Sequence, residues 1–300
     1  MRILAISLSN IGDAVMTTPV LERLHALYPD AVVDIIGDRR SSILFTHCPY
    51  RGEIFHKRKE EGWHGLLKLI RQLRRTHYDL IADLRTDGLA YLLRGRRRLV
   101  KWGRKAYGPH AVEDLMSIID RINPERTIPA PKVWLSAAEH TAADTLLEGF
   151  AAYRLLALGP GANWEPKIWA AEAFAETANL LGTEVDGVVL LGGPGDVERA
   201  RRVVQRLELP HRDLTSRCDL LTAAAVLERC ALFIGNDSGL GHLASGVGTP
   251  TLTVFGSGQP ARYHPWGTNA RWLVGAQRDL ANVAAADVTA LARAQLAHAA

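Results

Sequence analysis

The segment GNDSGLGHLASGVGTP at residues 235–250 combines residue types that are suited to binding an anion. It follows ALFI at 231–234, which is typical of a buried strand, and a helix is expected to begin near Ser238 or Gly239. The open N–H groups and partial positive charge of a helix start attract phosphate, and His242 falls one turn into this helix. The segment predicts a phosphate or diphosphate site, although an ordinary helix cap would explain it equally well by itself.

A second glycine-rich loop, GPGANWEPKIWAAEAF at 159–174, follows another apolar run. Gly159 and Gly161 leave the backbone open to a ligand, and Lys167 stands just before a predicted helix. A lysine there can neutralise a diphosphate, whereas the alternative is a plain surface lysine. Trp164 and Trp169 are interpreted as packing residues.

The chain also begins with a strand and a polar loop, SNIGDAVMTTP at 9–19. The loop is not GxGxxG, so the dinucleotide fingerprint is absent. It places Asp13 at the start of a helix, where an acid is either a cap or a general base that faces a ligand.

A fourth loop, GGPGDVERA at 192–200, offers two acids. Asp196 or Glu198 could accept hydrogen bonds from a ribose, or either could simply favour a helix start.

Together these loops suit the chemistry of a sugar nucleotide. Breaking its glycosidic bond places negative charge on the departing diphosphate, which Lys167 and the helix start at 238–242 would stabilise. A carboxylate would deprotonate the acceptor hydroxyl. The chain contains no Asp-x-Asp, and its three cysteines, Cys48, Cys218 and Cys230, are too scattered for a metal site, so no metal and no cofactor are expected.

Strand and helix patterns alternate along the chain, which predicts an α/β protein with parallel sheets. Strands are expected at 2–8, 31–37, 78–84, 98–103, 154–161, 187–193, 231–235 and 251–256, and helices at 14–28, 86–93, 136–150, 169–182, 195–208, 219–229, 239–247 and 283–298. The stretch NPERTIPAPKVW at 123–134 holds three prolines and is the predicted linker. We therefore expect two Rossmann-like, doubly wound domains facing a cleft, with the loops above at the carboxyl ends of the strands.

Composition agrees with a globular protein and excludes a membrane span. The 300 residues are 47% hydrophobic and 23% charged, and no apolar run is long enough to cross a bilayer. Residues 1–150 hold 23 Lys and Arg against 18 Asp and Glu. The excess of basic residues is concentrated at 68–75 and 94–105. These segments are either solvated faces or a surface for anionic lipid or a phosphorylated acceptor. Nucleic acid is not expected, because interleaved aromatic residues are lacking.

Three of these segments make the chain resemble glycosyltransferase family 9, the ADP-heptose:lipopolysaccharide heptosyltransferases. They are LSNIGDAVMTTPVL at 8–21, GANWEPKIWAAEAFAE at 161–176 and GNDSGLGHLASGVGTPTLTVFG at 235–256. The resemblance implies a GT-B fold with an acceptor-binding domain over 1–134 and a donor-binding domain over 135–282. It also implies a C-terminal helix, 283–300, that crosses back to the first domain.

The resemblance also implies roles for individual residues. The catalytic base would be Asp13. The donor would be bound by Asn163 and Lys167 near the phosphate, by Asp237 at the sugar hydroxyls, and by Ser238, Gly239 and His242 at the diphosphate. Inverting transfer from ADP-heptose, without a metal, would take place on a lipopolysaccharide core glycolipid, with Kdo or heptose as acceptor. The protein would be cytoplasmic and peripheral at the anionic inner membrane.

Two departures from the family pattern leave alternatives open. The ribose-binding Glu has no clear match, although Glu198 lies nearby, and the first domain is short. From charge alone, we expect Arg85, Arg94, Arg97 and Lys101 to contact the phosphate or Kdo carboxylate of the acceptor. The alternatives are a transferase that uses another nucleotide sugar, a GT-B-like sugar-nucleotide epimerase, and a non-catalytic glycan- or nucleotide-sugar-binding protein.

Overall fold

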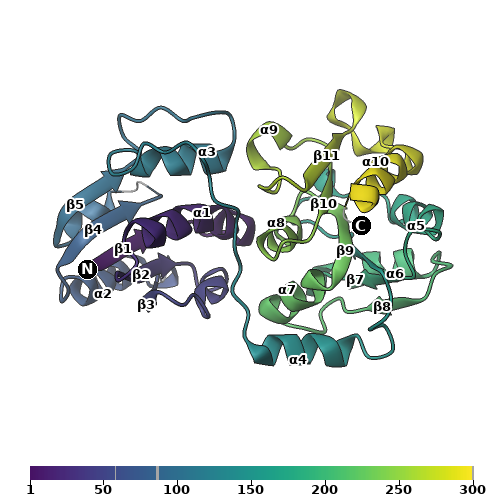
Figure 1. Cartoon of the computed structure of the whole chain (residues 1–300), viewed down its shortest axis with the longest axis horizontal. Helices are drawn as coiled ribbons and strands as arrows, with labels where there is room; N and C mark the ends of the chain where they lie inside the picture. Colours follow the sequence, from purple (N-terminus) through teal and green to yellow (C-terminus); the bar gives the residue numbers. More distant parts are fainter. Residues whose placement is uncertain (58, 86–87, 299–300) are drawn as a thin grey trace. The chain divides into compact units, whose positions relative to one another are not determined.

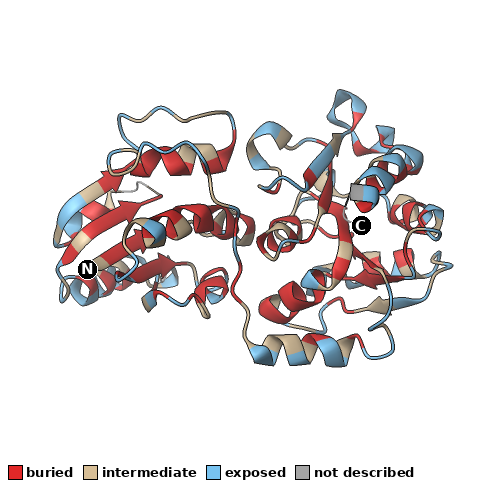
Figure 2. Ribbon diagram, viewed as in Figure 1, coloured by how far each residue is buried: buried red, intermediate tan, exposed pale blue. Residues whose placement is uncertain are grey.

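The computed structural model describes residues 1–57, 59–85 and 88–298. The chain forms two compact units, Met1–Trp134 and Leu135–Ala300, each built on one parallel sheet (Figure 1). Buried residues follow the strands of both sheets (Figure 2), as expected for parallel sheets covered by helices.

The sheet of the first unit has the strand order β3-β2-β1-β4-β5. Its strands are β1 (Arg2–Ile6), β2 (Val32–Gly37), β3 (Arg51–His56), β4 (Tyr78–Asp83) and β5 (Gly95–Val100). Its helices are α1 (Ile11–Leu27), α2 (Gly62–Leu73) and α3 (Ala111–Met116), with the 3₁₀ helices η1 (Ser42–Phe45), η2 (Lys59–Glu61), η3 (Leu89–Leu92) and η4 (Ser117–Ile119). Leu4 and Ile6 of β1 belong to the core that α2 and η3 cover, so α2 and η3 lie on one face of this sheet.

The sheet of the second unit has the order β11-β10-β9-β6-β7-β8. Its strands are β6 (Leu155–Gly159), β7 (Gly187–Leu190), β8 (His211–Asp213), β9 (Cys230–Asn236), β10 (Thr251–Phe255) and β11 (Ala270–Val274). Its helices are α4 (Ala137–Leu146), α5 (Ala171–Leu180), α6 (Val197–Val204), α7 (Leu220–Glu228), α8 (Gly239–Gly246), α9 (Pro260–Tyr263) and α10 (Ala285–His298), with η5 (Glu165–Lys167), η6 (Pro194–Asp196), η7 (Ala276–Arg278) and η8 (Leu280–Asn282).

The C-terminal helix α10 belongs to the core of the second unit. Its residues Val288, Ala292 and Leu296 are buried in the same cluster as β6 and β9, and the helix packs against α5. The apolar side of α10 thus helps to cover the second sheet. The return of this helix to the first domain stays a prediction.

The expected alternation of strands and helices is present, but short polar elements were missed. β3, β8 and β11 were not predicted, and neither were the helices α3 and α9. In the segment predicted as a helix over 86–93, residues 86 and 87 lie outside the described residues, and the remainder holds the 3₁₀ helix η3. Among the described residues, no helix is long and apolar enough to cross a membrane.

The segment predicted as a linker is fastened to the first unit. The buried Arg23 guanidinium on α1 donates hydrogen bonds to the Glu125 carboxylate and to the Thr127 carbonyl. Further along, the Lys132 N–H donates to Thr18 Oγ1 at 2.8 Å. Trp134 is buried and meets the ring of Tyr50 edge-on, with a centroid distance of 5.9 Å. The linker is therefore anchored almost to the unit boundary.

Candidate active site

The loop after β6 carries the residues expected to hold a phosphate. It leaves the strand at Gly159, where a Cβ would lie 2.7 Å from the Phe233 ring, so only glycine fits. Asn163 and Trp164 are exposed in the loop, and Lys167 ends the single turn of η5. Trp169, at the far end, is buried and donates from Nε1 to the Val283 carbonyl at 3.1 Å.

Asn236, the last residue of β9, fixes both ends of this loop. Its side chain is fully buried, its Nδ2 donates to the Pro160 carbonyl at 2.8 Å, and its Oδ1 accepts from the Trp169 N–H at 2.9 Å. The sequence analysis did not single out this residue. The available signal was a polar side chain at the end of an otherwise apolar strand. Asn236 sets the course of the loop that carries Lys167.

Lys167 and Asp237 form the charged centre of the site. Lys167 Nζ lies 2.6 Å from Asp237 Oδ2, and both side chains are mostly shielded from solvent. A Cβ at Gly258 would lie 2.7 Å from Asp237 Oδ2, so the loop after β10 also closes on this carboxylate. Loops from β6, β9 and β10 thus meet at one ion pair, as the carboxyl ends of neighbouring parallel strands should.

The helix α8 begins immediately beside this pair. Ser238 is its N-cap in extended conformation, yet its side chain makes no capping hydrogen bond, and its buried Oγ has no hydrogen-bond partner within the described chain. Gly239 opens the helix, and His242 lies buried in its first turn. Open backbone N–H groups and an unused hydroxyl at a helix start are well placed to receive an anion.

The two acids of the fourth loop have different surroundings. Asp196 ends η6 and accepts a hydrogen bond from the Gly193 N–H at 2.9 Å. Its carboxyl group lies so close to Gly161 that a Cβ added there would be 2.1 Å from it. Glu198 is 68% exposed and is held by two hydrogen bonds from Arg201 at 2.9 and 2.7 Å. Hydrogen bonding to Arg201 keeps the pKa of the Glu198 carboxyl below its ordinary value. Asp196, not Glu198, therefore adjoins the loop that carries Lys167.

At the carboxyl edge of the first sheet, Asp13 lies in the first turn of α1. It is half-buried, and its Oδ2 accepts a hydrogen bond from Asn10 Nδ2 at 2.8 Å. Arg85 comes two residues after β4, and its guanidinium donates to Ser9 Oγ in the loop that leads to Asp13. The structure thus brings Arg85 to the same loop as the predicted base.

The other predicted acceptor contacts are spread along β5. Lys101 directly follows the strand at its carboxyl end and pairs with Asp114 on α3. Arg97 lies within the strand and donates to the Arg121 carbonyl at 2.8 Å. Arg94 precedes the strand, and its carbonyl accepts from the Tyr78 N–H at the start of β4. Arg94 is therefore at the amino edge of the sheet, away from Arg85 and Lys101.

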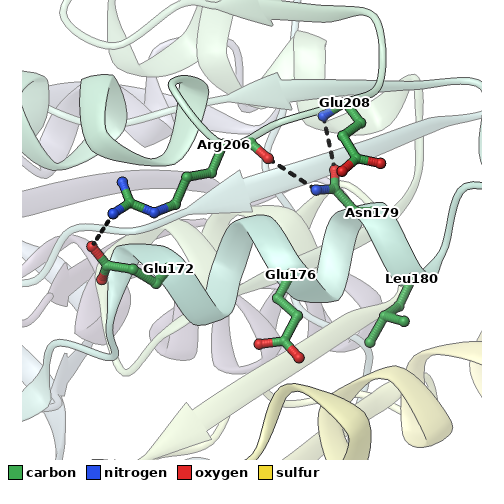
Figure 3. Close-up of a pocket in the computed structure, with 6 residues that line it drawn as sticks. All are labelled: Glu172, Glu176, Asn179, Leu180, Arg206 and Glu208. Carbon is green, nitrogen blue, oxygen red and sulfur yellow. Dashed lines mark hydrogen bonds and ion pairs between the residues drawn. The ribbon is translucent and has the colours of Figure 1, made fainter.

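A separate hollow of about 400 Å³ lies on the outer side of α5. Figure 3 shows that Asn179 Nδ2 donates to the Arg206 carbonyl at 2.9 Å, that its Oδ1 accepts from the Glu208 N–H at 3.0 Å, and that Glu172 pairs with the Arg206 side chain. These contacts tie α5 to the turn after α6. None of the candidate site residues lines this hollow.

A family model described as glycosyltransferase family 9 (heptosyltransferase) matches residues 91–290, which are 200 of the 300 residues. The chain belongs to glycosyltransferase family 9. It is therefore a glycosyltransferase, and the resemblance inferred from its three motifs is confirmed. Of the alternatives from the sequence, a family 9 transferase with another nucleotide sugar is the one compatible with this membership.

Heptosyltransferases are among the relatives of this family 9 chain. Lipopolysaccharide core heptosyltransferase OpsX of Haemophilus influenzae is 23% identical over 86% of this chain and 80% of its own length. Lipopolysaccharide heptosyltransferase 2 of Escherichia coli is 26% identical over 90% of this chain and 87% of its own length.

Solved structures of this family share the fold. A family 9 glycosyltransferase from Veillonella parvula superposes with a TM-score of 0.85 at 21% identity, covering 99% of this chain and 97% of that one. ADP-heptose lipopolysaccharide heptosyltransferase II of E. coli superposes with a TM-score of 0.80 at 23% identity, covering 99% of both chains. These similarities confirm the predicted GT-B fold with two parallel α/β domains.

Proposed function

We propose that this glycosyltransferase moves a heptose from ADP-heptose to a Kdo or heptose unit of a lipopolysaccharide inner core, with inversion and without a metal. The observation that carries the proposal is the grouping of Lys167, Asp237 and the Ser238 hydroxyl, which makes no capping hydrogen bond, at the start of α8. The heptosyltransferases among its relatives, and a solved E. coli heptosyltransferase described with ADP, support the choice of donor.

In the proposed reaction, an acceptor hydroxyl oxygen attacks the anomeric carbon of the donor sugar while the bond from that carbon to the diphosphate oxygen breaks. Asp13 takes the hydroxyl proton, and its hydrogen bond from Asn10 orients the carboxylate. ADP leaves with the electron pair of the broken bond. Lys167 and the N–H groups of α8 stabilise the negative charge that grows on the diphosphate.

The donor-bound state requires the Lys167–Asp237 pair to be shared with the ligand. Lys167 turns its charge to the diphosphate, while Asp237 accepts hydrogen bonds from sugar hydroxyls. Asn163 and His242 line the phosphates. Of the two acids that the sequence offered for the ribose, Asp196 rather than Glu198 accepts its hydrogen bonds. The half-buried pair holds both groups in position beforehand at little cost in stability.

On the acceptor side, Arg85 and Lys101 are proposed to bind the anionic groups of the core glycolipid, because both lie at the carboxyl edge that holds Asp13. Such an acceptor is lipid-linked, so the enzyme is proposed to work at the cytoplasmic surface of the inner membrane. Arg94 and Arg97 lie further from Asp13 along β5 and are assigned no contact with the reacting sugar.

The first test is thermal stabilisation of the protein by ADP, UDP, GDP and NAD at equal concentration. A ligand at 100 times its dissociation constant adds about 2.7 kcal/mol to the free energy of unfolding. We expect a shift with ADP alone, and a mass-spectrometric assay with ADP-heptose and a delipidated core acceptor should then show transfer that survives EDTA. A shift with UDP or GDP instead would discard the ADP-heptose donor, and loss of transfer in EDTA would discard metal independence.

A further inference from the structure

The outer side of α2 exposes a strip that joins apolar and cationic side chains. Trp63 is 78% exposed, and Leu67 and Arg71 follow it at intervals of four residues along the helix. Side chains four residues apart lie one above another on a helix, so these three form one line. The buried side of α2, Leu69 and Leu73, holds the helix on the sheet and leaves this line outward.

From the start of α2 to the turn that follows it, the charged side chains have one sign, whereas Glu60 and Glu61 of η2 precede the helix. Residues 62–77 contain Lys68, Arg71, Arg74 and Arg75 and no Asp or Glu. All four cations are exposed, and none of them takes part in an ion pair between described residues of the first unit. The cations of α2 are therefore available to an external anionic surface.

A second exposed apolar group lies on the same side of the sheet. Tyr91 of η3 and Trp102 after β5 stack with ring centroids 5.5 Å apart, yet they remain 53% and 58% exposed, and Leu92 is exposed beside them. Leu89 and Leu93, on either side of this group, share the buried cluster with Leu69 of α2. One core thus holds both exposed groups over one face of the first sheet.

We propose that these residues form a docking surface for an anionic lipid bilayer. The surface, called the aromatic–basic face, comprises Trp63, Leu67, Arg71, Tyr91, Leu92 and Trp102. Tryptophan and tyrosine favour the interface between lipid and water, and nearby Lys and Arg are attracted to anionic headgroups. The proposal rests on the proposed function, since a lipid-linked acceptor has to be met at a membrane.

The charge argues against a second copy of the chain as the occupant. A symmetric dimer through this face would place the cations of α2 against the same cations of its partner, with no carboxylate in 62–77 to compensate. An anionic bilayer satisfies both the cations and the exposed rings.

The test is binding of the whole protein to vesicles, measured by co-sedimentation. We expect binding to vesicles that contain phosphatidylglycerol, weaker binding to pure phosphatidylcholine, and a decline as salt is raised. The double variant Trp63→Ala/Arg71→Gln should bind the anionic vesicles about tenfold or more weakly. Loss of the arginine charge alone lowers the binding constant about fivefold, and loss of the exposed tryptophan lowers it further. The control Arg271→Gln/Trp272→Ala changes an exposed Arg–Trp pair on β11 and should bind like the wild type.

Vesicle binding is independent of sugar transfer, so the two proposals can fail separately. Turnover with a delipidated acceptor should be equal in the wild type and the Trp63→Ala/Arg71→Gln variant, whereas turnover with a vesicle-embedded acceptor should fall in that variant alone. Equal vesicle binding by this variant and the β11 control would overturn the docking surface. So would a wild-type dimer in size-exclusion chromatography that the α2 substitutions dissociate.

Discussion

The carboxyl edges of the two sheets hold their charged residues in different ways. In the second unit, loops from three strands converge on the Lys167–Asp237 pair, and the fully buried Asn236 clamps the loop that carries the lysine. In the first unit, Asp13 accepts a hydrogen bond from its neighbour Asn10, and the Arg85 guanidinium donates to Ser9 of the same loop. Buried clamps support the donor edge, whereas local side-chain contacts support the acceptor edge.

This difference matches what each edge is proposed to do. A diphosphate needs fixed opposite charge as it leaves, and fixed groups need no reorganisation when the charge develops. A base has to meet the hydroxyls of a bulky acceptor, and the Asp13 side chain is half-buried rather than enclosed. Substitutions at the two edges should therefore separate turnover from donor binding.

The largest effect is expected at Asp13. The variant Asp13→Asn should lower kcat by about 10²- to 10⁴-fold, because the hydroxyl proton has no acceptor of suitable basicity. Its affinity for ADP, measured by calorimetry, should stay at the wild-type value, since the donor edge is unchanged. Near-normal turnover in a clean preparation would remove Asp13 from the role of base.

At the donor edge, Lys167→Ala should weaken ADP binding by about 10- to 100-fold, the value of one or two hydrogen bonds from a charged group. The matched change Asp237→Asn removes the competing partner of the lysine, so ADP binding should be unchanged or tighter while turnover of the intact donor falls. Calorimetry on both variants checks the pair. Unchanged ADP affinity in Lys167→Ala would contradict its phosphate role.

Asn236→Ala should lower the free energy of unfolding by about 1–3 kcal/mol, because two buried backbone groups lose their partner. ADP affinity should fall with it, since the loop that carries Lys167 is released. The control is Asn179→Ala, which also loses two hydrogen bonds to the backbone but lies on α5. Chemical denaturation and calorimetry are the measurements, and equal ADP affinity in the two variants would show that Asn236 has no role in the site.

A smaller effect on ADP affinity is expected from the two acids of the fourth loop, Asp196 and Glu198. Asp196→Asn should weaken ADP binding by about tenfold, the value of one charge-assisted hydrogen bond. Glu198→Gln should leave it unchanged, because Glu198 is exposed and bound to Arg201. The reverse order in calorimetric titrations would restore the assignment made from the sequence.

The smallest effect is expected on the KM for the acceptor. Arg85→Gln should raise the acceptor KM several-fold, since one partly exposed charge contributes about 1 kcal/mol. The same change at Arg94, at the amino edge of the sheet, should have no effect on a delipidated acceptor. Steady-state kinetics at saturating donor distinguishes the two, and equal KM values for both variants would argue against the Arg85 contact.

The sequence predicted the loops better than it predicted the side chains within them. The apolar runs before residues 159 and 235 are long and buried, so the strands and the edge that follows them could be placed. β3 was missed because RGEIFH has only two adjacent apolar residues, Ile54 and Phe55, and so shows neither a long apolar run nor strict alternation. β8 was missed because HRD is only three residues long.

Orientation within a turn could not be predicted. Asp196 and Glu198 are two residues apart, and only the 3₁₀ turn of η6 decides that the first adjoins Gly161 while the second lies outward. Trp164 and Trp169 were both interpreted as packing residues. The second is buried, whereas the first is 54% exposed, because the loop departs from the core before Asn236 draws it back.

The anchored linker limits how the two units can turn. Trp134 is packed against Tyr50, and Ser136 already caps α4 through Glu139, so Leu135 is the residue between two fixed ends. Any reorientation has to be absorbed by the backbone dihedrals of two or three residues. Fixing the backbone costs about 1–2 kcal/mol of conformational entropy per residue. Fixing a joint of two or three residues therefore costs far less than fixing a flexible tether over the whole 123–135 segment. The packing therefore leaves a short pivot, with a small entropic cost, at the end of the segment predicted as the linker.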